Sequence, residues 1–377
     1  MKQTEIGLIP DDWEVKEIKD FADVTTGDKN TQDAEENGKY PFFVRSPIVE
    51  KINKFSYDVE GVITAGDGVG TGKVFHYAKG KFGLHQRAYL IYNFKNTDPK
   101  YFYYNFSKNF YERVHSMTAK SSVDSVRREM ITKMQIPIPP TLPEQQRIAK
   151  ALSDVDALIF TTEKLLQKKK NIKQGTMQEL LTGKKRLPGF AKSNNTKMTE
   201  LGEIPEDWEM KSVSSLLKIG HGKDYKNLKE GAVPVFGTGG YMTSVNDYLY
   251  DGDTVCIGRK GTIDKPFFHT GKIWTVDTLF YTYDFVNCIP KFIYYAFCLV
   301  DWLSMNEASG VPSLTSKNIE DVFLCIPSNV SEQTAIVNVL SDMDAEIEKL
   351  SAKLQKYHQL KTAMMQQLLT GKIRLKF

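Results

Sequence analysis

A stretch of 41 residues occurs in two similar copies, and this repeat restricts the fold more than any other feature of the chain. The first copy spans 143–183, from PEQQRIAKALSDVD to QELLTG, and the second spans 331–371, from SEQTAIVNVLSDMD to QQLLTG. Apolar residues recur in both at steps of three and four, the spacing of a helix with one buried side. Pro143 and Glu144 favour a helix start, and Gly183 favours a helix end. We therefore predict two long helices.

The apolar positions of these helices predict a helix–helix seam. Its expected members are Ile148, Leu152, Val155, Ile159 and Leu166 in the first copy, and Ile336, Leu340, Met343, Ile347, Leu350 and Leu354 in the second. Leu158, Leu165 and Ile172 are expected to widen the first stripe, whereas Lys361 interrupts the second. Two such helices in one chain most simply bury their stripes against each other. The alternative is that each helix packs alone on its own domain.

A second motif precedes each helix copy. TEIGLIPDDW at 4–13 returns as TELGEIPEDW at 199–208, and each copy opens a globular segment that leads to a long helix. The globular segments themselves match only loosely, at 99–104 with 290–295 and at 123–139 with 311–327. Matching frames around two diverged segments indicate one scaffold that presents two different binding surfaces.

The globular segments are predicted to mix short strands with helices, which gives an α+β fold. Segments rich in β-branched and aromatic residues predict strands at 59–64, 87–92, 254–257 and 274–283. Aromatic helices are expected to follow Pro99 and Pro290, with core positions for Tyr101, Tyr104, Phe110 and Tyr111. Glycine-rich 66–73 is predicted to be a loop between strands, and 236–240 a turn.

Composition is that of an ordinary globular protein of two or three domains, with 377 residues, 41% of them hydrophobic and 25% charged. The chain has no run of 18 apolar residues, and its first residues lack the apolar core of a signal peptide, so we expect a cytoplasmic protein. The four cysteines, all in the second half and without CxxC spacing, are expected to be buried reduced thiols rather than metal ligands.

Positive charge is concentrated in the first globular segment. Residues 70–133 contain 12 Lys and Arg but four acids, which is the pattern of a phosphate-binding surface. A solvated basic face is the alternative. Residues 258–321 of the second segment contain six Lys and Arg and seven acids, so partner chains supply much of the phosphate binding in this half, or this half docks protein more than DNA.

Motifs for catalysis are absent from the sequence. The GDGVGTGK segment at 66–73 fails as a phosphate-binding Walker loop, because Val74 stands where Ser or Thr must bind magnesium. No NPPY or DPPY tetrapeptide, GxSxG or HExxH occurs. Glu14 with Lys16, and Glu209 with Lys211, have the ExK spacing of metal-dependent nucleases, but their duplication favours a structural role. We predict no catalytic residue and no metal ligand, and hence a chain that is not an enzyme by itself.

Four duplicated motifs together resemble a known family. They are the IPxxW opening, the PEQ or SEQ helix start, the LSDxD step and the LLTGKxRL ending. They occur in this order twice, each time around a diverged segment. The chain thereby resembles, over essentially its whole length, the specificity subunit of type I restriction–modification systems.

The resemblance implies a domain layout and a set of partners. Residues 1–140 and 197–328 would be two target-recognition domains, separated by antiparallel coiled-coil helices at 141–196 and 329–377 with an internal pseudo-two-fold repeat. Each domain would read one half of a split, asymmetric double-stranded DNA site. Two methyltransferase subunits would bind the scaffold and carry S-adenosylmethionine and the N6-adenine chemistry. Restriction subunits would add ATP- and magnesium-dependent translocation and cleavage, so no cofactor is expected in this chain.

The predicted helices are also long enough to act as a spacer. A helix of about 38 residues is about 57 Å long at 1.5 Å per residue, comparable with one turn of DNA at 34–36 Å once the domains lean back along it. Inserting or deleting a heptad within Leu165–Gln178 is expected to change the spacer between half-sites and to leave the half-sites unaltered.

Candidate DNA contacts lie in the basic loops, where lysines suit phosphates and arginines suit guanine edges. They are Lys73, Lys79, Lys81, His85, Arg87, Lys120, Ser121, Arg127 and Arg128 in the first domain, and Arg259, Lys260, Lys265, Lys272, Ser316 and Lys317 in the second. Arg127 and Arg128 equally suit a helix surface or a subunit contact.

Two other functions stay open on the sequence. The chain could be a coiled-coil interaction protein, or a decoy specificity subunit, whose domains bind protein rather than DNA. It could also be a nuclease that uses the ExK pairs.

Overall fold

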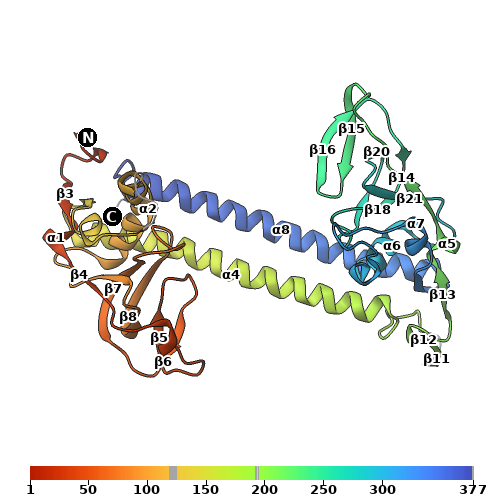
Figure 1. Ribbon diagram of the computed structural model, residues 1–377, viewed down its shortest axis with the longest axis horizontal. Helices are drawn as coiled ribbons and strands as arrows, with labels where there is room; N and C mark the ends of the chain where they lie inside the picture. The colour runs from red at the N-terminus through yellow and green to blue at the C-terminus, as the bar shows by residue number, and fades with distance from the viewer. Residues whose placement is uncertain (119–124, 192, 194, 376–377) are drawn as a thin grey trace. The chain divides into compact units, whose positions relative to one another are not determined.

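The computed structural model describes residues 1–118, 125–191, 193 and 195–375, and it divides the chain into two compact units (Figure 1). Unit 1 consists of Met1–Glu163 with Ala352–Phe377, and unit 2 consists of Lys164–Ser351. The two predicted long helices are α4 (Leu142–Leu181) and α8 (Val330–Leu368). Each unit therefore contains one globular domain, one end of α4 and one end of α8.

The domain of unit 1 is built on a six-stranded sheet. Its strand order is β4 (Asp23–Thr26), β9 (Ala88–Tyr92), β7 (Tyr57–Ala65), β8 (Phe75–Leu84), β5 (Tyr40–Phe43) and β6 (Glu50–Ile52). All neighbours are antiparallel except β5 and β8. Helix α2 (Pro99–Thr118) packs its buried Phe102, Phe106 and Phe110 into the core that also contains Val62 and Ile91 of the sheet.

Smaller elements connect this sheet to the helices. The opening motif forms the hairpin of β1 (Lys2–Thr4) and β2 (Gly7–Ile9), and β3 (Glu14–Glu17) pairs with β10 (Gln135–Ile138) just before α4. The remaining elements are α1 (Ile18–Phe21), η1 (Thr31–Asp33) and α3 (Arg128–Thr132).

Unit 2 repeats this frame around a different domain. The hairpin of β11 (Thr196–Thr199) and β12 (Gly202–Pro205) is followed by β13 (Trp208–Ser212), which pairs with β22 (Phe323–Pro327). One sheet has the order β14 (Lys218–His221), β21 (Leu279–Tyr283), β18 (Thr254–Gly258), β19 (Phe267–His269); the other has β16 (Gly240–Val245), β15 (Glu230–Gly237), β20 (Lys272–Thr275), β17 (Tyr250–Asp251). The helices are α5 (Val213–Leu216), α6 (Pro290–Phe297), η2 (Trp302–Met305) and α7 (Ser316–Glu320).

The predicted α+β fold class is confirmed, and most predicted elements are found. Helices follow Pro99 and Pro290, the 66–73 segment connects β7 with β8, and 236–240 contains the turn between β15 and β16. The single strand predicted at 274–283 is wrong, because the chain turns at 276–278 and passes from one sheet to the other. Tyr101, Tyr104 and Phe110 are buried as predicted, whereas Tyr111 is 44% exposed.

Within each unit the two long helices pair in antiparallel orientation. In unit 1, Asp156 of α4 lies 2.6 Å from Lys361 of α8, and Glu163 lies 3.8 Å from His358. In unit 2, Lys173 lies 2.5 Å from Asp344, and Lys169 lies 2.8 Å from Glu346. The break that Lys361 makes in the apolar pattern is therefore an ion pair between the helices.

Asp156 and Asp344, the last residues of the two LSDxD motifs, also hold the domains. Each accepts a hydrogen bond at 2.7 Å from a tyrosine hydroxyl of the domain in its own unit, Tyr104 in unit 1 and Tyr295 in unit 2. The repeated aspartate thus joins a domain to both helices, which explains why the motif occurs twice.

The predicted seam residues are buried to different degrees. Ile148 and Leu152 belong to the core of unit 1, and Ile336 and Leu340 belong to the core of unit 2. The other buried members are Val155 and Ile159, and the half-buried ones are Leu166, Met343, Ile347, Leu350 and Leu354. The predicted widening of the first stripe is wrong, since Leu158, Leu165 and Ile172 are 42–44% exposed.

In unit 1 an arginine beyond the end of α8 connects the opening motif to the start of α4. Arg374 donates from Nε and Nη2 to the Glu144 carboxylate at 2.8 and 2.7 Å, and from Nη1 to Asp12 at 2.9 Å. Gly371 ends the helix with φ of 67°, where a Cβ would come within 2.4 Å of the Pro10 side chain. Three motifs from distant parts of the chain therefore meet here.

Unit 2 contains the same arrangement with the other copy of each motif. Arg186, which follows α4, donates to Glu332 and to Asp207, with Nη2–Oε2 and Nη1–Oδ1 distances of 2.8 and 2.7 Å. The side chains of Arg186 and Glu332 are 10% and 2% exposed, and Trp208 also donates to Glu332 at 3.3 Å. Burial makes each of these charged groups dependent on its partner.

Removing the guanidinium of Arg186 should destabilise unit 2 strongly, because Glu332 would remain as a buried, unpaired charge. We expect Arg186→Ala to lower the free energy of unfolding by about 3 kcal/mol or more. Urea denaturation followed by tryptophan fluorescence measures this, since Trp208, Trp274 and Trp302 all lie in unit 2.

The matched control is Lys218→Ala, which breaks an ion pair with Asp284 whose side chains are 65% and 56% exposed. An exposed pair of this kind contributes less than about 1 kcal/mol. Equal losses for the two variants would contradict the structural role assigned to Arg186.

Candidate nucleic-acid interface

Three loop segments meet at equivalent places in the two domains. In unit 1, the Gly66 N–H donates to the Arg87 carbonyl at 2.8 Å, and the Val126 N–H donates to the Gly66 carbonyl at 2.7 Å. In unit 2, the Arg259 N–H donates to the Thr278 carbonyl at 2.8 Å. We call these places the loop edges, which comprise 66–73, 85–87 and 125–128 in unit 1, and 259–265, 276–278 and 313–317 in unit 2.

The same hydrogen bonds establish which residues correspond. The Leu314 N–H donates to the Arg259 carbonyl at 2.9 Å, as Val126 does to Gly66, and the bridges Asp67–Ser125 and Lys260–Ser313 are equivalent. Arg259 therefore occupies the position of Gly66, Lys260 that of Asp67, and Thr278 that of Arg87. The frame is shared, but the side chains that it presents differ in charge.

Two of the predicted contacts are exposed to solvent at the loop edge of unit 1. Arg87 has a side chain that is 60% exposed, with Nη1 3.1 Å from Asp67. Lys73 is exposed, with its ammonium 5.6 Å from the centre of the Tyr111 ring. His85 is only 4% exposed, and its Nδ1 accepts a hydrogen bond from the Arg87 N–H at 3.0 Å. Burial lowers the pKa of His85, so this residue is better suited to holding Arg87 than to binding phosphate.

Other predicted contacts of the first domain are placed differently. Arg127 and Arg128 are exposed at the start of α3, but Arg128 donates to the Val24 carbonyl at 2.7 Å. Lys79 and Lys81 lie on β8 opposite Glu60 and Asp58, away from the loop edge, and Lys79 pairs with Glu60 at 3.3 Å. Lys120 and Ser121 lie outside the described residues.

The loop edge of unit 2 contains a cleft of about 680 Å³. The cleft brings together Arg259, Lys260 and Ser316 of the predicted contacts, and His221, Asp277 and Phe280 also line it. Arg259 and Lys260 are exposed, and the Arg259 Nη1 donates to the Asp277 carbonyl at 3.3 Å. This cleft therefore offers two cations and several hydrogen-bonding groups in one concave surface.

Three predicted contacts of unit 2 do not line this cleft. Lys265 is exposed in the segment that follows β18, and Lys272 begins β20 with its ammonium 4.6 Å from the Tyr248 ring centre. Lys317 is exposed on α7 and pairs with Asp321 at 2.7 Å.

Arg45 contacts the loop edge of unit 1 and was not among the contacts predicted from the sequence. It follows β5 and donates to Asp67 at 2.5 Å. It lies outside the basic segment 70–133, and a lone arginine after a strand has no distinguishing pattern. The contact depends on pairing between β5 and β8, which the sequence does not reveal.

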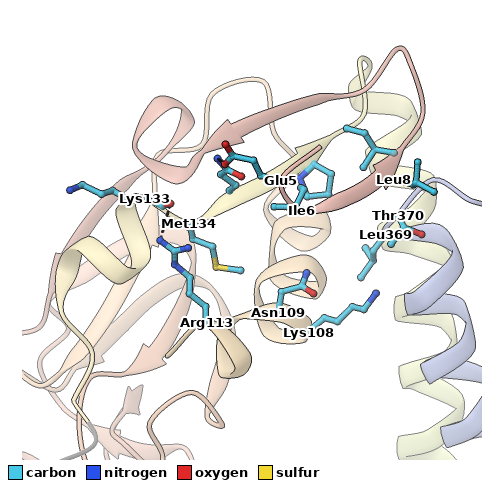
Figure 2. A pocket seen from close by; sticks show the side chains of 13 residues that line it. Glu5, Ile6, Leu8, Lys108, Asn109, Arg113, Lys133, Met134, Leu369 and Thr370 are labelled. Atoms are coloured by element: carbon cyan, nitrogen blue, oxygen red, sulfur yellow. Dashed lines mark hydrogen bonds between the residues drawn. The ribbon is translucent and has the colours of Figure 1, made fainter. Parts of the chain in front are cut away.

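A separate hollow of about 550 Å³ in unit 1 lies between the β1–β2 hairpin, α2 and the end of α8 (Figure 2). Its cations are engaged by the protein itself. Lys108 donates to the Met365 carbonyl at 3.1 Å, and Arg113 donates to the Met130 and Lys133 carbonyls at 2.7 and 2.9 Å. None of the predicted DNA contacts that the structure describes lines this hollow.

The ExK pairs form ion pairs on strands. Glu14 lies 2.7 Å from Lys16 on β3, and Glu209 lies 2.7 Å from Lys211 on β13. In the part of the chain that the structure describes, no group of three or more His, Cys, Asp or Glu side chains could hold a metal ion. The cysteines are free thiols, but the predicted burial holds only for Cys256, since Cys288 and Cys325 are half-buried and Cys298 is exposed.

No helix among the described residues is both long enough and apolar enough to span a membrane.

Comparisons with known proteins agree with the duplicated architecture. The family model for the type I restriction modification DNA specificity domain matches residues 10–174 and again 205–356. The specificity subunit named for the type I restriction enzyme MjaX of Methanocaldococcus jannaschii is 25% identical over all of this chain and 97% of its own length. The MjaVIII specificity subunit of the same organism is 31% identical over 58% of this chain and 52% of its own length.

A solved structure agrees with the fold over the whole chain. The type I restriction–modification S subunit from M. genitalium superposes with a TM-score of 0.71, covering 98% of both chains at 17% sequence identity. This likeness shows the fold, and the two matches of the family model, which cover most of the chain, show that the chain belongs to the family of type I restriction–modification DNA specificity subunits.

Proposed function

We propose that this chain reads a split DNA site, with unit 1 binding one half-site and unit 2 the other. One observation carries the proposal: two domains present different side chains at the same place in the same frame. Asp67 and Arg87 in unit 1 correspond to Lys260 and Thr278 in unit 2. Direct readout requires particular donors and acceptors at base edges, so two such surfaces favour two different base sequences and an asymmetric site.

The chemistry of the complex would belong to partner subunits. Two methyltransferase subunits would bind the long helices and supply S-adenosylmethionine for N6-adenine methylation, and restriction subunits would supply ATP- and magnesium-dependent cleavage. This chain would be the non-catalytic part that selects the site. We place the complex in the cytoplasm, where its DNA substrate is.

Arginine and lysine at the loop edge of unit 2 should have separable effects on recognition. Arg259 is placed beside the cleft and suits bidentate contact with a guanine edge, whereas Lys265 suits a phosphate. We expect Arg259→Ala to relax one base position of one half-site by about 10-fold or more, and Lys265→Ala to weaken binding to all duplexes alike.

Sequencing of methylated adenines, with binding titrations on cognate and scrambled duplexes, distinguishes these effects. A uniform loss of affinity in Arg259→Ala on cognate and scrambled DNA would remove this arginine from the base-reading residues.

The length of the paired helices should set the spacer between the half-sites. A deletion must keep the ion pairs Asp156–Lys361 and Lys173–Asp344 intact, so residues 162–168 of α4 and 349–355 of α8 should be removed together. Seven residues correspond to about 10 Å of helix, or about three base pairs of DNA. We expect the methylated site to have a shorter spacer and unchanged half-sites.

The matched control is removal of 162–168 alone, which leaves the two helices with unequal lengths and should lower thermal stability. A double deletion that folds and methylates DNA with the original spacer would contradict the role of the helices as a spacer.

The exposed apolar residues of α4 are candidates for partner docking. Leu165 and Ile172 lie seven residues apart, hence on one face of the helix, and each is 42% exposed. We expect Ile172→Glu to lower the amount of methyltransferase subunit that copurifies with the chain, because a carboxylate would have to be buried in the contact.

Val286→Glu places the same charge on a 54% exposed apolar residue of the unit 2 domain and should leave copurification unchanged. Equal copurification in both variants would place the docking surface elsewhere.

The other function classes make opposite predictions. An interaction protein or a decoy subunit would assemble with partners yet show no sequence preference on DNA. A nuclease that used the ExK pairs would cut DNA with magnesium and without partners.

A further inference from the structure

At the loop edge of unit 1, one carboxylate lies between two arginines. Arg45 Nη1 donates to Asp67 Oδ1 at 2.5 Å, and Arg87 Nη1 donates to Asp67 Oδ2 at 3.1 Å. The side chains of Arg45 and Arg87 are 38% and 60% exposed, and that of Asp67 is 25% exposed. All three side chains are therefore partly exposed, the two arginines more than the aspartate. We call these three residues the cluster.

Three different elements hold this cluster. Arg45 follows β5, Asp67 lies in the loop after β7, and Arg87 precedes β9. The backbone of Arg87 is fixed on both sides, because its N–H donates to His85 Nδ1 at 3.0 Å and its carbonyl accepts from the Gly66 N–H at 2.8 Å. Convergence of separate elements with fixed backbones is what holds a recognition group in one geometry.

The charge state of Asp67 supports a persistent contact. Burial by itself would raise the pKa of the carboxyl, but the hydrogen bonds and charges of Arg45 and Arg87 lower that pKa below its ordinary value. Asp67 is thus ionised at neutral pH, and the cluster has a net charge of one positive unit. Each guanidinium has five N–H donors and uses one of them in its hydrogen bond to Asp67, so the other donors remain available to a ligand.

We propose that Arg45 and Arg87, oriented by Asp67, bind the major-groove edge of guanine and set part of the sequence preference of unit 1. This inference rests on the function proposed above. Guanine presents two acceptors, O6 and N7, that match the paired donors of a guanidinium. Asp67 does not touch the base and is a positioning residue.

The aspartate argues against a phosphate site. A carboxylate between the two cations would repel phosphate oxygens, whereas the acceptors of guanine are neutral. Because unit 2 has Lys260 and Thr278 at the corresponding positions, the effect should be confined to one half-site.

The experiment uses the full chain assembled with its methyltransferase subunits and a library of DNA duplexes with randomised half-sites. The variants are Arg45→Lys, Arg87→Lys and Asp67→Asn. Lysine keeps the charge but loses the bidentate geometry. The control is Lys19→Ala, which removes the 54% exposed lysine of the Lys19–Glu17 ion pair in the same unit. Circular dichroism melting verifies that each variant is folded.

We expect Arg45→Lys and Arg87→Lys to lower the preference for G·C about 10-fold or more at one or two positions of a single half-site. The dependence of affinity on salt should change little, because the number of charges is unchanged. Asp67→Asn should relax the same positions while binding to random duplexes stays equal or increases. Replacing guanine there by 7-deazaguanine should weaken binding by the wild type more than binding by Arg45→Lys or Arg87→Lys.

Two results would overturn the inference while the proposed function stands. One is a sequence-specific complex in which all three variants keep every base preference of the wild type. The other is that the positions relaxed in the variants are not G·C in the wild-type half-site. A wild-type complex without any sequence preference would overturn the proposed function and this inference together. Relaxed preference in Lys19→Ala at the same positions would also count against it.

Discussion

Each unit depends on a buried glutamate at the start of one long helix, which forms an ion pair with an arginine that follows the other long helix. Glu144 and Glu332 are almost fully buried, and their charges are balanced by Arg374 and Arg186, respectively. Because a buried carboxylate without its partner is strongly destabilising, the pair fixes where each helix end must lie. The opening motif joins the same cluster through Asp12 or Asp207.

This interaction explains why the repeated motifs are found where they are. The arginine in each unit comes from one copy of the helix repeat, and the glutamate comes from the other copy. The domain of unit 1 is therefore completed by a segment far away in the sequence, 352–375, whereas unit 2 is one continuous stretch in which residues 164–188 directly precede the domain. The frame is the constrained part of the chain, and the loop edges are free to differ, as Asp67 and Lys260 do at one shared position.

Helical periodicity and duplication made the frame predictable from the sequence. The two long helices and the strands within 57–65 and 254–258 follow from local patterns, and so do the helices that follow Pro99 and Pro290. The role of Lys361 did not, because an ion pair between helices looks like a defect in an apolar repeat. Leu158, Leu165 and Ile172 satisfy the apolar spacing yet remain exposed, since periodicity does not show which stripe has a partner within the chain.

The sequence predicts where the loop edges lie in the chain better than it predicts which charged side chains meet there. Arg87 and Arg259 were chosen by charge and lie there, whereas Lys79 and Lys81 belong to the same basic segment and lie elsewhere on β8. Arg45 and His85 show the reason. Pairing of distant strands brings Arg45 to Asp67 and buries His85 beneath Arg87, and no local sequence pattern encodes that pairing.

Site-specific photo-crosslinking to DNA tests the central claim most directly. A photoreactive amino acid at Val69, which is 96% exposed in the loop edge of unit 1, and another at Val311, which is 54% exposed at the cleft of unit 2, would mark the DNA that each domain contacts. In the complex with the methyltransferase subunits, we predict crosslinks from Val69 in one half-site and from Val311 in the other. Crosslinks from both positions in the same half-site would contradict the account.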